Sequence, residues 1–301
     1  MAGINPIDPL PSNSDRKVFW RKFFGLPRWR RLIGVVLGTY VGILVLTMLF
    51  QEWLIYFPSR AYDMTPASAG LDFEDVRLVT ADRVTIAAWF VPRPDARATV
   101  LFFHGNAGNN GDRVPEIKAF HSLGCAVMMV DYRGYGPSAG RPTELGTYLD
   151  AEAAWKFLTE ARGVSPESIV IFGESIGGAV AIELATRHTP GALVIQSSFT
   201  RLTDIAAIHY PFLPVRWLIR NRYDSIDKVG RIACPKLFIH SKDDTLVPIV
   251  NGRALFDAAA EPKRFLETPG GHNDGGFMLS REHTASLGEF MDSALPPKPT
   301  R

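Results

Sequence analysis

Residues 168–179 read SIVIFGESIGGA, and this stretch combines three features in a fixed order. Four apolar residues, three of them β-branched, predict a buried strand; Gly-x-Ser-x-Gly follows, and small residues then open a helix. A serine between a strand and a helix lies on a sharp turn, where glycines two residues to either side avoid collisions with the neighbouring backbone. The turn exposes the hydroxyl at the positive end of the helix dipole. The stretch therefore predicts that Ser175 is a catalytic nucleophile.

Ser175 needs a base and an orienting acid, because a serine hydroxyl is a poor nucleophile near neutral pH. A strand predicted at 236–240 is followed by SKDDTLVP, in which Asp243 and Asp244 are both candidates for the acid. A later strand ends in a glycine-rich loop that presents His272, the predicted base. The order serine, aspartate, histidine along the chain is the order that accompanies a strand–Ser–helix turn of this kind.

An acyl-transfer site also needs hydrogen-bond donors for the negative oxygen that forms during attack. The sequence FFHGNAGN at 102–109 predicts a glycine-bearing turn after a strand, and the backbone amides of Asn106 and Ile176 are the predicted donors. No histidine, cysteine or carboxylate spacing in the sequence matches a metal site, and no dinucleotide-binding loop is complete, so neither a metal nor a cofactor is predicted. The six histidines other than His272 are expected to be structural.

The body of the chain, residues 51–301, alternates short apolar segments with helical patterns. A hairpin followed by repeated strand–helix units implies an α/β fold, a mostly parallel central sheet with helices on both faces, in one domain. Residues 199–231 fit neither pattern and are predicted to form a small lid or cap. The predicted strands are 76–80, 84–91, 99–103, 126–131, 168–172, 192–196, 236–240 and 264–267, and the predicted helices are 143–161, 176–187, 250–259 and 281–293.

The N-terminal part contains a predicted transmembrane helix at 32–50, LIGVVLGTYVGILVLTMLF, 19 residues without a charge. This length is close to the ~20 residues that cross a bilayer core. A cleaved signal peptide is the alternative, but the small-residue tripeptide at 67–69 lies 17 residues beyond the apolar run, which favours an uncleaved anchor. Trp29, Trp53 and Tyr56 are predicted to be interfacial aromatic residues.

The charges that flank this segment predict its orientation. The basic tail at 1–31 holds seven Lys and Arg residues, whereas Arg60 is the only basic residue at 51–70. The positive-inside rule therefore predicts a cytoplasmic N-terminus and an extracytoplasmic catalytic domain, periplasmic if the protein is bacterial. Within the apolar segment, Gly34, Gly38 and Gly42 recur every four residues and predict a smooth face for a homodimer.

Charge and cysteine content exclude two classes of protein. Residues 1–31 hold seven of the 33 basic but only two of the 31 acidic residues, so the remainder carries 26 basic and 29 acidic side chains. A mildly acidic body argues against nucleic-acid binding, which needs a basic face. Two cysteines, Cys125 and Cys234, are too few for a Cys-rich zinc or redox site.

Taken together, these motifs resemble the α/β-hydrolase superfamily, and within it the membrane-anchored Bem46-like hydrolases related to the mammalian alpha/beta hydrolase domain-containing types 13 and 17. In this family the pattern HGxxDxxVP carries the acid on its aspartate, which corresponds to Asp244, while Ser241 stands where the family usually has glycine. The resemblance covers residues 50–293 and rests on HGNAGN at 104–109, DYRGYGPS at 131–138, GESIGG at 173–178, HYPFLPVRWLIRNRYDS at 209–225, HSKDDTLVP at 240–248 and GGHND at 270–274.

The resemblance implies an α/β-hydrolase fold preceded by one transmembrane helix, and hydrolysis of carboxylic esters or thioesters. With the motifs, it predicts an acyl-enzyme on Ser175, with Asp244 and His272 completing the triad. An anchor beside such a site suggests acyl substrates derived from lipids or membrane proteins. An acyltransferase or a peptidase with the same triad is an alternative, as is a non-catalytic, membrane-anchored scaffold or binding protein that kept the fold.

Overall fold

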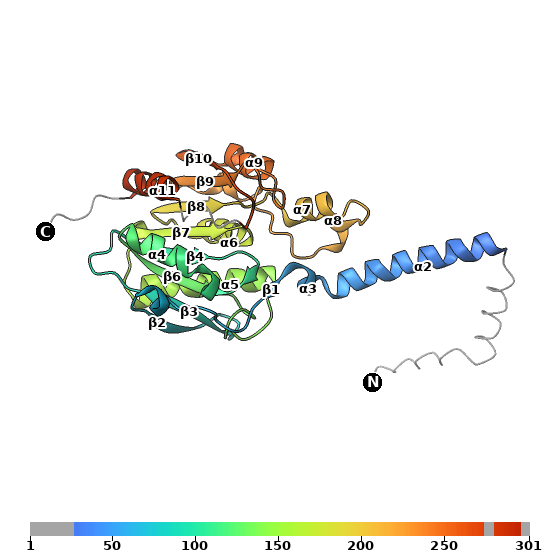
Figure 1. The fold of residues 1–301 in the computed structure, drawn as a ribbon, viewed down its shortest axis with the longest axis horizontal. Coiled ribbons are helices and arrows are strands. Elements are labelled where there is room, and N and C mark those ends of the chain that lie inside the picture. The colour runs from blue at the N-terminus through green and yellow to red at the C-terminus, as the bar shows by residue number, and fades with distance from the viewer. Residues whose placement is uncertain (1–26, 274–279, 296–301) are drawn as a thin grey trace, which may run out of the picture. The chain divides into compact units, whose positions relative to one another are not determined.

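A computed structural model of the chain describes residues 27–273 and 280–295 (Figure 1). Contacts divide the chain into two units, Met1–Gln51 and Glu52–Arg301. Most of the predicted basic tail, residues 1–26, lies outside the described residues, and so does Asp274 of the GGHND sequence.

The first unit contains helix α2, Arg28–Leu49, whose 22 residues are all unburied. Its most apolar window has a mean hydropathy of 2.4, so it is long and apolar enough to cross a membrane, and no other helix of the described residues is. The helix begins four residues before the predicted span at 32–50. The prediction counted only uncharged residues, whereas arginine is a good helix former and the Pro27 carbonyl accepts the first helical hydrogen bonds.

The second unit is built on an eight-stranded sheet in the order β10-β9-β8-β7-β4-β6-β3-β2. β2 and β3 form an antiparallel hairpin, β3 pairs antiparallel with β6, and every other neighbouring pair is parallel. The mostly parallel sheet of the predicted fold class is confirmed, and so are all eight predicted strands. Their bounds are β2 Glu74–Val79, β3 Thr85–Val91, β4 Ala98–Phe103, β6 Cys125–Asp131, β7 Ile169–Glu174, β8 Ala192–Gln196, β9 Lys236–Ser241 and β10 Lys263–Thr268.

Helices cover both faces of this sheet, and successive strand residues point to opposite cores. On β4, Phe102 packs into the core that contains residues of α4 and α11, whereas Phe103 packs into the core formed with α5, α6 and α9. The helices are α3 Gln51–Ile55, α4 Val114–Ser122, α5 Glu144–Lys156, α6 Ile176–Ala185, α7 Leu202–His209, α8 Val215–Leu218, α9 Val250–Ala258 and α11 Arg281–Ala294.

The second unit differs from the sequence-based expectations in four respects. Helix α4 was not predicted; its Pro115 lies in the first turn of the helix, where proline is well tolerated. Residues 199–231, expected to lack a regular pattern, contain α7 and α8, which project from the sheet (Figure 1). The short parallel pair β1 Phe57–Pro58 and β5 Ala107–Gly108 was also not predicted. Tyr56, expected at a membrane interface, is 4 % exposed and packs in the core.

Two glycines allow the strand–turn–helix connection around Ser175 to form. A Cβ atom on Gly173 would lie 2.3 Å from the Gly177 carbonyl oxygen, and one on Gly177 would lie 2.1 Å from the Phe103 carbonyl oxygen. Both obstacles are backbone atoms, so a side chain could be accommodated only by moving the helix away from the sheet. The glycines therefore let α6 pack directly against β4 and β7.

This packing predicts that Gly177→Ala destabilises the protein, even though alanine is the better helix former. We expect a loss of at least about 3 kcal/mol of unfolding free energy, seen as a melting temperature at least about 6 °C lower in detergent. Gly288→Ala in α11 is the matched control, because its Cβ would meet only the flexible end of Leu123 at 3.3 Å. Equal melting temperatures for the two variants would contradict the close-packing account.

Candidate active site

Ser175 occupies a strained backbone conformation between β7 and α6. Its φ is 54° and its ψ is −116°, a region that residues with a side chain rarely adopt. The Ser175 N–H donates to the Gln196 carbonyl oxygen on β8 at 2.8 Å, which fixes the turn to the next strand. Such strain costs about 1–3 kcal/mol and persists only where the surrounding structure imposes it.

The structure brings the three predicted site residues together. His272 Nε2 lies 3.2 Å from Ser175 Oγ, and His272 Nδ1 lies 2.7 Å from Asp244 Oδ2. The three side chains follow β7, β9 and β10, which are parallel and therefore end at the same edge of the sheet. With the proton on Nδ1, the imidazole donates to the aspartate and presents an unprotonated Nε2 to the serine.

Asp244 is buried, and four groups contact its carboxylate: two backbone N–H groups and two imidazoles. Its Oδ1 accepts the backbone N–H of Leu246 at 3.0 Å and of Val247 at 2.8 Å. Burial alone would raise the pKa of Asp244, but hydrogen bonds from His240, His272 and the Val247 N–H outweigh burial and lower it well below the usual value. The carboxylate is therefore ionised at neutral pH.

Asp243, the other candidate acid, is exposed, and its carboxylate contacts the backbone of Gly270 rather than the ring of His272. Its Oδ2 accepts the Gly270 N–H at 3.3 Å. The loop carrying both aspartates is further tied to the His272 loop by Ser241, whose hydroxyl donates to the Gly270 carbonyl oxygen. The serine at the usual glycine position thus adds a contact between the loops of the acid and the base.

His240 was expected only to close a strand, and sequence reasoning missed its contact with the site. Its ring is 1 % exposed; Nε2 donates to the Val247 carbonyl oxygen at 2.7 Å and lies 3.5 Å from Asp244 Oδ2. Gly252 on α9 makes room for it, since a Cβ there would lie 2.3 Å from His240 Nδ1. In the sequence, the spacing of four residues between His240 and Asp244 could have indicated that the two side chains are close.

The predicted oxyanion turn lies against Ser175. A Cβ built on Gly105 would stand 3.7 Å from the Ser175 Cβ. The next residue, Asn106, is held by its side chain, which donates to the Ile55 carbonyl oxygen at 2.7 Å, and by its own carbonyl oxygen, which accepts from Phe57 N–H at 3.0 Å and from Tyr135 Oη at 2.6 Å. Among the described residues, the backbone N–H groups of Asn106 and Ile176 have no hydrogen-bond partner, which leaves both available to a ligand.

Comparison with known proteins places this geometry in a family. The family model described as serine aminopeptidase, S33, matches residues 94–225. The chain is 38 % identical over 271 residues to an uncharacterized protein of Mycobacterium tuberculosis, covering 88 % of this chain and 96 % of that protein. It is 35 % identical to protein bem46 of Schizosaccharomyces pombe, covering 71 % and 77 %, and 35 % identical to human alpha/beta hydrolase domain-containing protein 17B, covering 81 % and 84 %. The chain belongs to the α/β-hydrolase family, among its Bem46-like members.

The solved structures agree with this family at the level of the fold. An esterase of Pyrococcus furiosus superposes with a TM-score of 0.68 and 22 % identity, over 80 % of this chain and all of that one. At this identity the similarity establishes that the two proteins share the α/β-hydrolase fold. The 35 % identity to bem46 and to alpha/beta hydrolase domain-containing protein 17B confirms the predicted resemblance to Bem46-like hydrolases.

Within residues 27–273 and 280–295, no group of three or more His, Cys, Asp or Glu side chains is placed to hold a metal ion. Cys125 and Cys234 are free and buried, and burial raises the pKa of each thiol to about 11. Neither cysteine is a reactive nucleophile at neutral pH.

A cluster of charged side chains lies beside the Ser175 turn. Arg113 Nε donates to Glu174 Oε2 at 2.9 Å, and both side chains are largely buried. Glu116 on α4 also faces Arg113, but its Oε2 is buried without a hydrogen-bond partner among the described residues. Burial raises the pKa of Glu116 to about 7, more than the attraction of Arg113 lowers it.

The raised pKa of Glu116 predicts a pH-dependent stability. Below pH 4.5 the carboxyl is neutral in both states; between 4.5 and about 7 the unfolded chain releases the proton while the folded chain keeps it. The unfolding free energy therefore falls as the pH rises through this window, by a total on the order of 3 kcal/mol. Glu116→Gln removes this loss.

Urea denaturation at about pH 5 and about pH 8 tests this expectation. The variant should gain stability over the wild type at the higher pH and gain less at the lower pH. Glu289→Gln on α11 is the control, since that side chain is 70 % exposed. A gain that is the same at both pH values would contradict the assignment.

Proposed function

We propose that this α/β hydrolase is a membrane-anchored serine hydrolase that cleaves carboxylic esters or thioesters through an acyl-enzyme on Ser175. The proposal rests on one observation, the continuous chain of contacts from Ser175 Oγ to His272 (3.2 Å) and from His272 to Asp244 (2.7 Å). The strained Ser175 backbone and the two unpartnered N–H groups beside it support the same function.

In the acylation step, Ser175 Oγ attacks the carbonyl carbon of the acyl substrate while His272 Nε2 accepts the hydroxyl proton. The carbonyl oxygen becomes negative and is stabilised by the backbone N–H groups of Asn106 and Ile176, whose own positions are fixed by the turn after β4 and by α6. Asp244 holds the imidazole in its tautomer and stabilises the imidazolium. When the tetrahedral intermediate collapses, His272 gives its proton to the departing oxygen or sulfur.

In the deacylation step, water replaces the departed alcohol or thiol. His272 Nε2 accepts a proton from the water as its oxygen attacks the acyl carbon, and the same two N–H groups hold the second oxyanion. Collapse breaks the bond to Ser175 Oγ, which takes the proton back from His272, and releases the carboxylic acid. The cycle needs no cofactor.

The ester or thioester class is supported by the contacts of Ser175, His272 and Asp244 and by the similarity of the fold to that of a Pyrococcus furiosus esterase. Because the matching family model is described as a serine aminopeptidase, we choose an aminoacyl amide as the substrate to compare with the esters and thioesters. The apolar helix α2 and its basic flank support the anchor, with the N-terminus cytoplasmic and the catalytic domain on the opposite side. A homodimer through Gly34, Gly38 and Gly42 is a further proposal for the anchor.

Steady-state hydrolysis of p-nitrophenyl esters, acyl thioesters and aminoacyl p-nitroanilides by the detergent-solubilised full chain tests this function. We expect turnover of the esters or thioesters, and a loss of kcat of about 10⁴-fold or more in Ser175→Ala and His272→Ala and of about 10⁴-fold in Asp244→Asn. Asp243→Asn is the matched control, because Asp243 is the exposed neighbour of Asp244. Its kcat should stay within about threefold of the wild type.

Three outcomes would contradict the proposed function. Turnover of the anilides alone would identify a peptidase. Transfer of the acyl group to an added alcohol in preference to water would identify an acyltransferase. A folded wild-type protein without turnover of any of these substrates would favour a scaffold that kept the fold.

The proposed orientation predicts which side of the membrane reacts with a membrane-impermeant maleimide. Val79 on β2 is 66 % exposed, so a label on Val79→Cys reports the side of the catalytic domain. In spheroplasts of a bacterial host, Val79→Cys should react before lysis, whereas Ser12→Cys in the tail should react only after lysis. The buried Cys125 and Cys234 leave a low background. The reverse pattern would overturn the orientation.

A further inference from the structure

Exposed apolar side chains of the catalytic unit are concentrated in one region. From Glu52 onward, the described residues include twelve large apolar side chains that are exposed, and ten of them, all except Met64 and Val79, lie on segments that contact one another. The most exposed is Trp217 on α8, at 89 %. The other nine are Trp53, Leu54, Phe57, Leu145, Ile208, Tyr210, Phe212, Leu246 and Val250.

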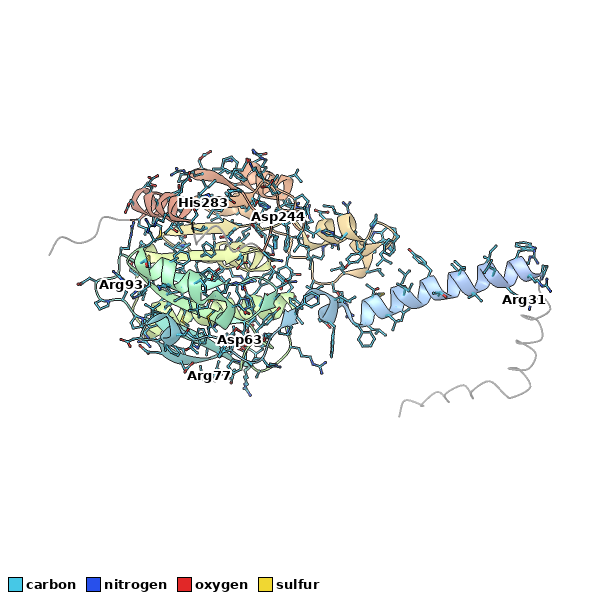
Figure 2. All side chains as sticks on the ribbon, viewed as in Figure 1. Arg31, Asp63, Arg77, Arg93, Asp244 and His283 are labelled. Carbon is cyan, nitrogen blue, oxygen red and sulfur yellow. The ribbon has the colours of Figure 1, made fainter. Side chains whose placement is uncertain are left out.

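Hydrogen bonds join the segments that carry these ten side chains. Tyr56 Oη lies 2.8 Å from Tyr223 Oη, which links the segment around Trp53 to the end of the α7–α8 segment. His209 Nε2 donates to the Leu246 carbonyl oxygen at 2.9 Å, and the Glu144 N–H donates to Asn221 Oδ1 at 2.7 Å. In Figure 1, β1, α7 and α8 lie at one end of the catalytic unit, and Figure 2, drawn from the same side, labels Asp244 near that end in projection.

The charge of the α7–α8 segment differs from that of the rest of the body. From the start of α7 to Tyr223, residues 202–223 contain three arginines and one acidic residue, Asp204, in a body that otherwise carries more acidic than basic residues. Arg222 pairs with Asp224 at 3.0 Å. Arg216 pairs with Asp204 at 3.2 Å, yet its side chain remains 70 % exposed beside Trp217. Aromatic and aliphatic side chains interleaved with arginine are typical of segments that bind the interface of an anionic bilayer.

The short connection between α2 and Trp53 keeps these exposed side chains close to the anchor. Helix α2 ends at Leu49, four residues before Trp53. Four extended residues span at most about 14 Å, so an anchor in the bilayer holds Trp53 and Leu54 near the membrane surface. The Tyr56–Tyr223 hydrogen bond then holds the end of the α7–α8 segment near the membrane surface as well.

We propose that residues 205–223, together with Trp53, Leu54 and Phe57, form a bilayer-facing surface that inserts into the headgroup–acyl boundary of an anionic membrane. This inference rests on the proposed anchor and hydrolase function. Through His209, the surface contacts Leu246, whose N–H binds the carboxylate of Asp244. The bilayer-facing surface thus lies next to the active site, and the acyl chain of the substrate enters from the bilayer rather than from water.

Spin-label accessibility in nanodiscs tests the surface independently of activity. The full chain carries a nitroxide at Trp217→Cys or, as the matched exposed control, at Val79→Cys, in phosphatidylcholine nanodiscs with roughly 30 % phosphatidylglycerol. We expect the label at 217 to be about fivefold less accessible to an aqueous nickel chelate than the label at 79, and more accessible to oxygen. Because Trp217 is so exposed, its replacement should leave the melting temperature unchanged.

Equal access of the nickel chelate to both labels would overturn the bilayer-facing surface. Low accessibility of the label at 217 to both the nickel chelate and oxygen would also overturn it, since protein rather than lipid would then cover these side chains. Either result can occur in a protein that hydrolyses esters, so failure of this inference is distinguishable from failure of the proposed function.

A kinetic measurement tests the entry route. The double variant Phe212→Ser and Trp217→Ser should hydrolyse a long-chain acyl ester embedded in the nanodisc about tenfold more slowly than the wild type, the equivalent of about 1.4 kcal/mol. Hydrolysis of a short, water-soluble p-nitrophenyl ester by the same sample should be unchanged. An equal loss on both substrates, or no loss on either, would contradict entry of the acyl chain from the bilayer.

Discussion

The backbone of Ser175 adopts φ 54° because β7 must turn at once into α6, and the rest of the site depends on this constraint. The close approach of α6 to β4 and β7 excludes any side chain at Gly173 or Gly177. It leaves the hydroxyl of Ser175 at the helix N-terminus and the first N–H of the helix beside it. The proposed nucleophile and one of the two proposed oxyanion donors therefore come from the same turn.

The remaining groups reach Ser175 because parallel strands end at one edge of the sheet. Asp244 follows β9, His272 follows β10, and the turn with Asn106 follows β4, so residues separated by more than 160 positions converge without any local sequence relation. Each loop is then fixed by its own contacts: Asp244 by His240 and two backbone N–H groups, and Asn106 by Ile55, Phe57 and Tyr135. The segment that follows α2 thus holds the turn that carries the other proposed oxyanion donor.

The sequence allowed the parallel sheet and the meeting of Ser175, Asp244 and His272 to be predicted, because periodicity and turn chemistry are local properties. From the residues alone, Asp243 and Asp244 were equivalent; only the family pattern distinguished them, and the structure shows that burial and hydrogen bonding separate the two. His240 and the burial of Tyr56 depend on partners that lie on other elements. Helix α4 was not predicted, although its Pro115 is compatible with the first turn of a helix.

Covalent labelling by a fluorophosphonate tests the central claim, that Ser175 is a nucleophile activated by His272, most directly. The detergent-solubilised full chain would be treated with the probe, digested and analysed by mass spectrometry. The account predicts a single phosphonylated residue, Ser175, and loss of nearly all labelling in His272→Ala. A folded wild-type protein without label, or with label on a different residue, would contradict it.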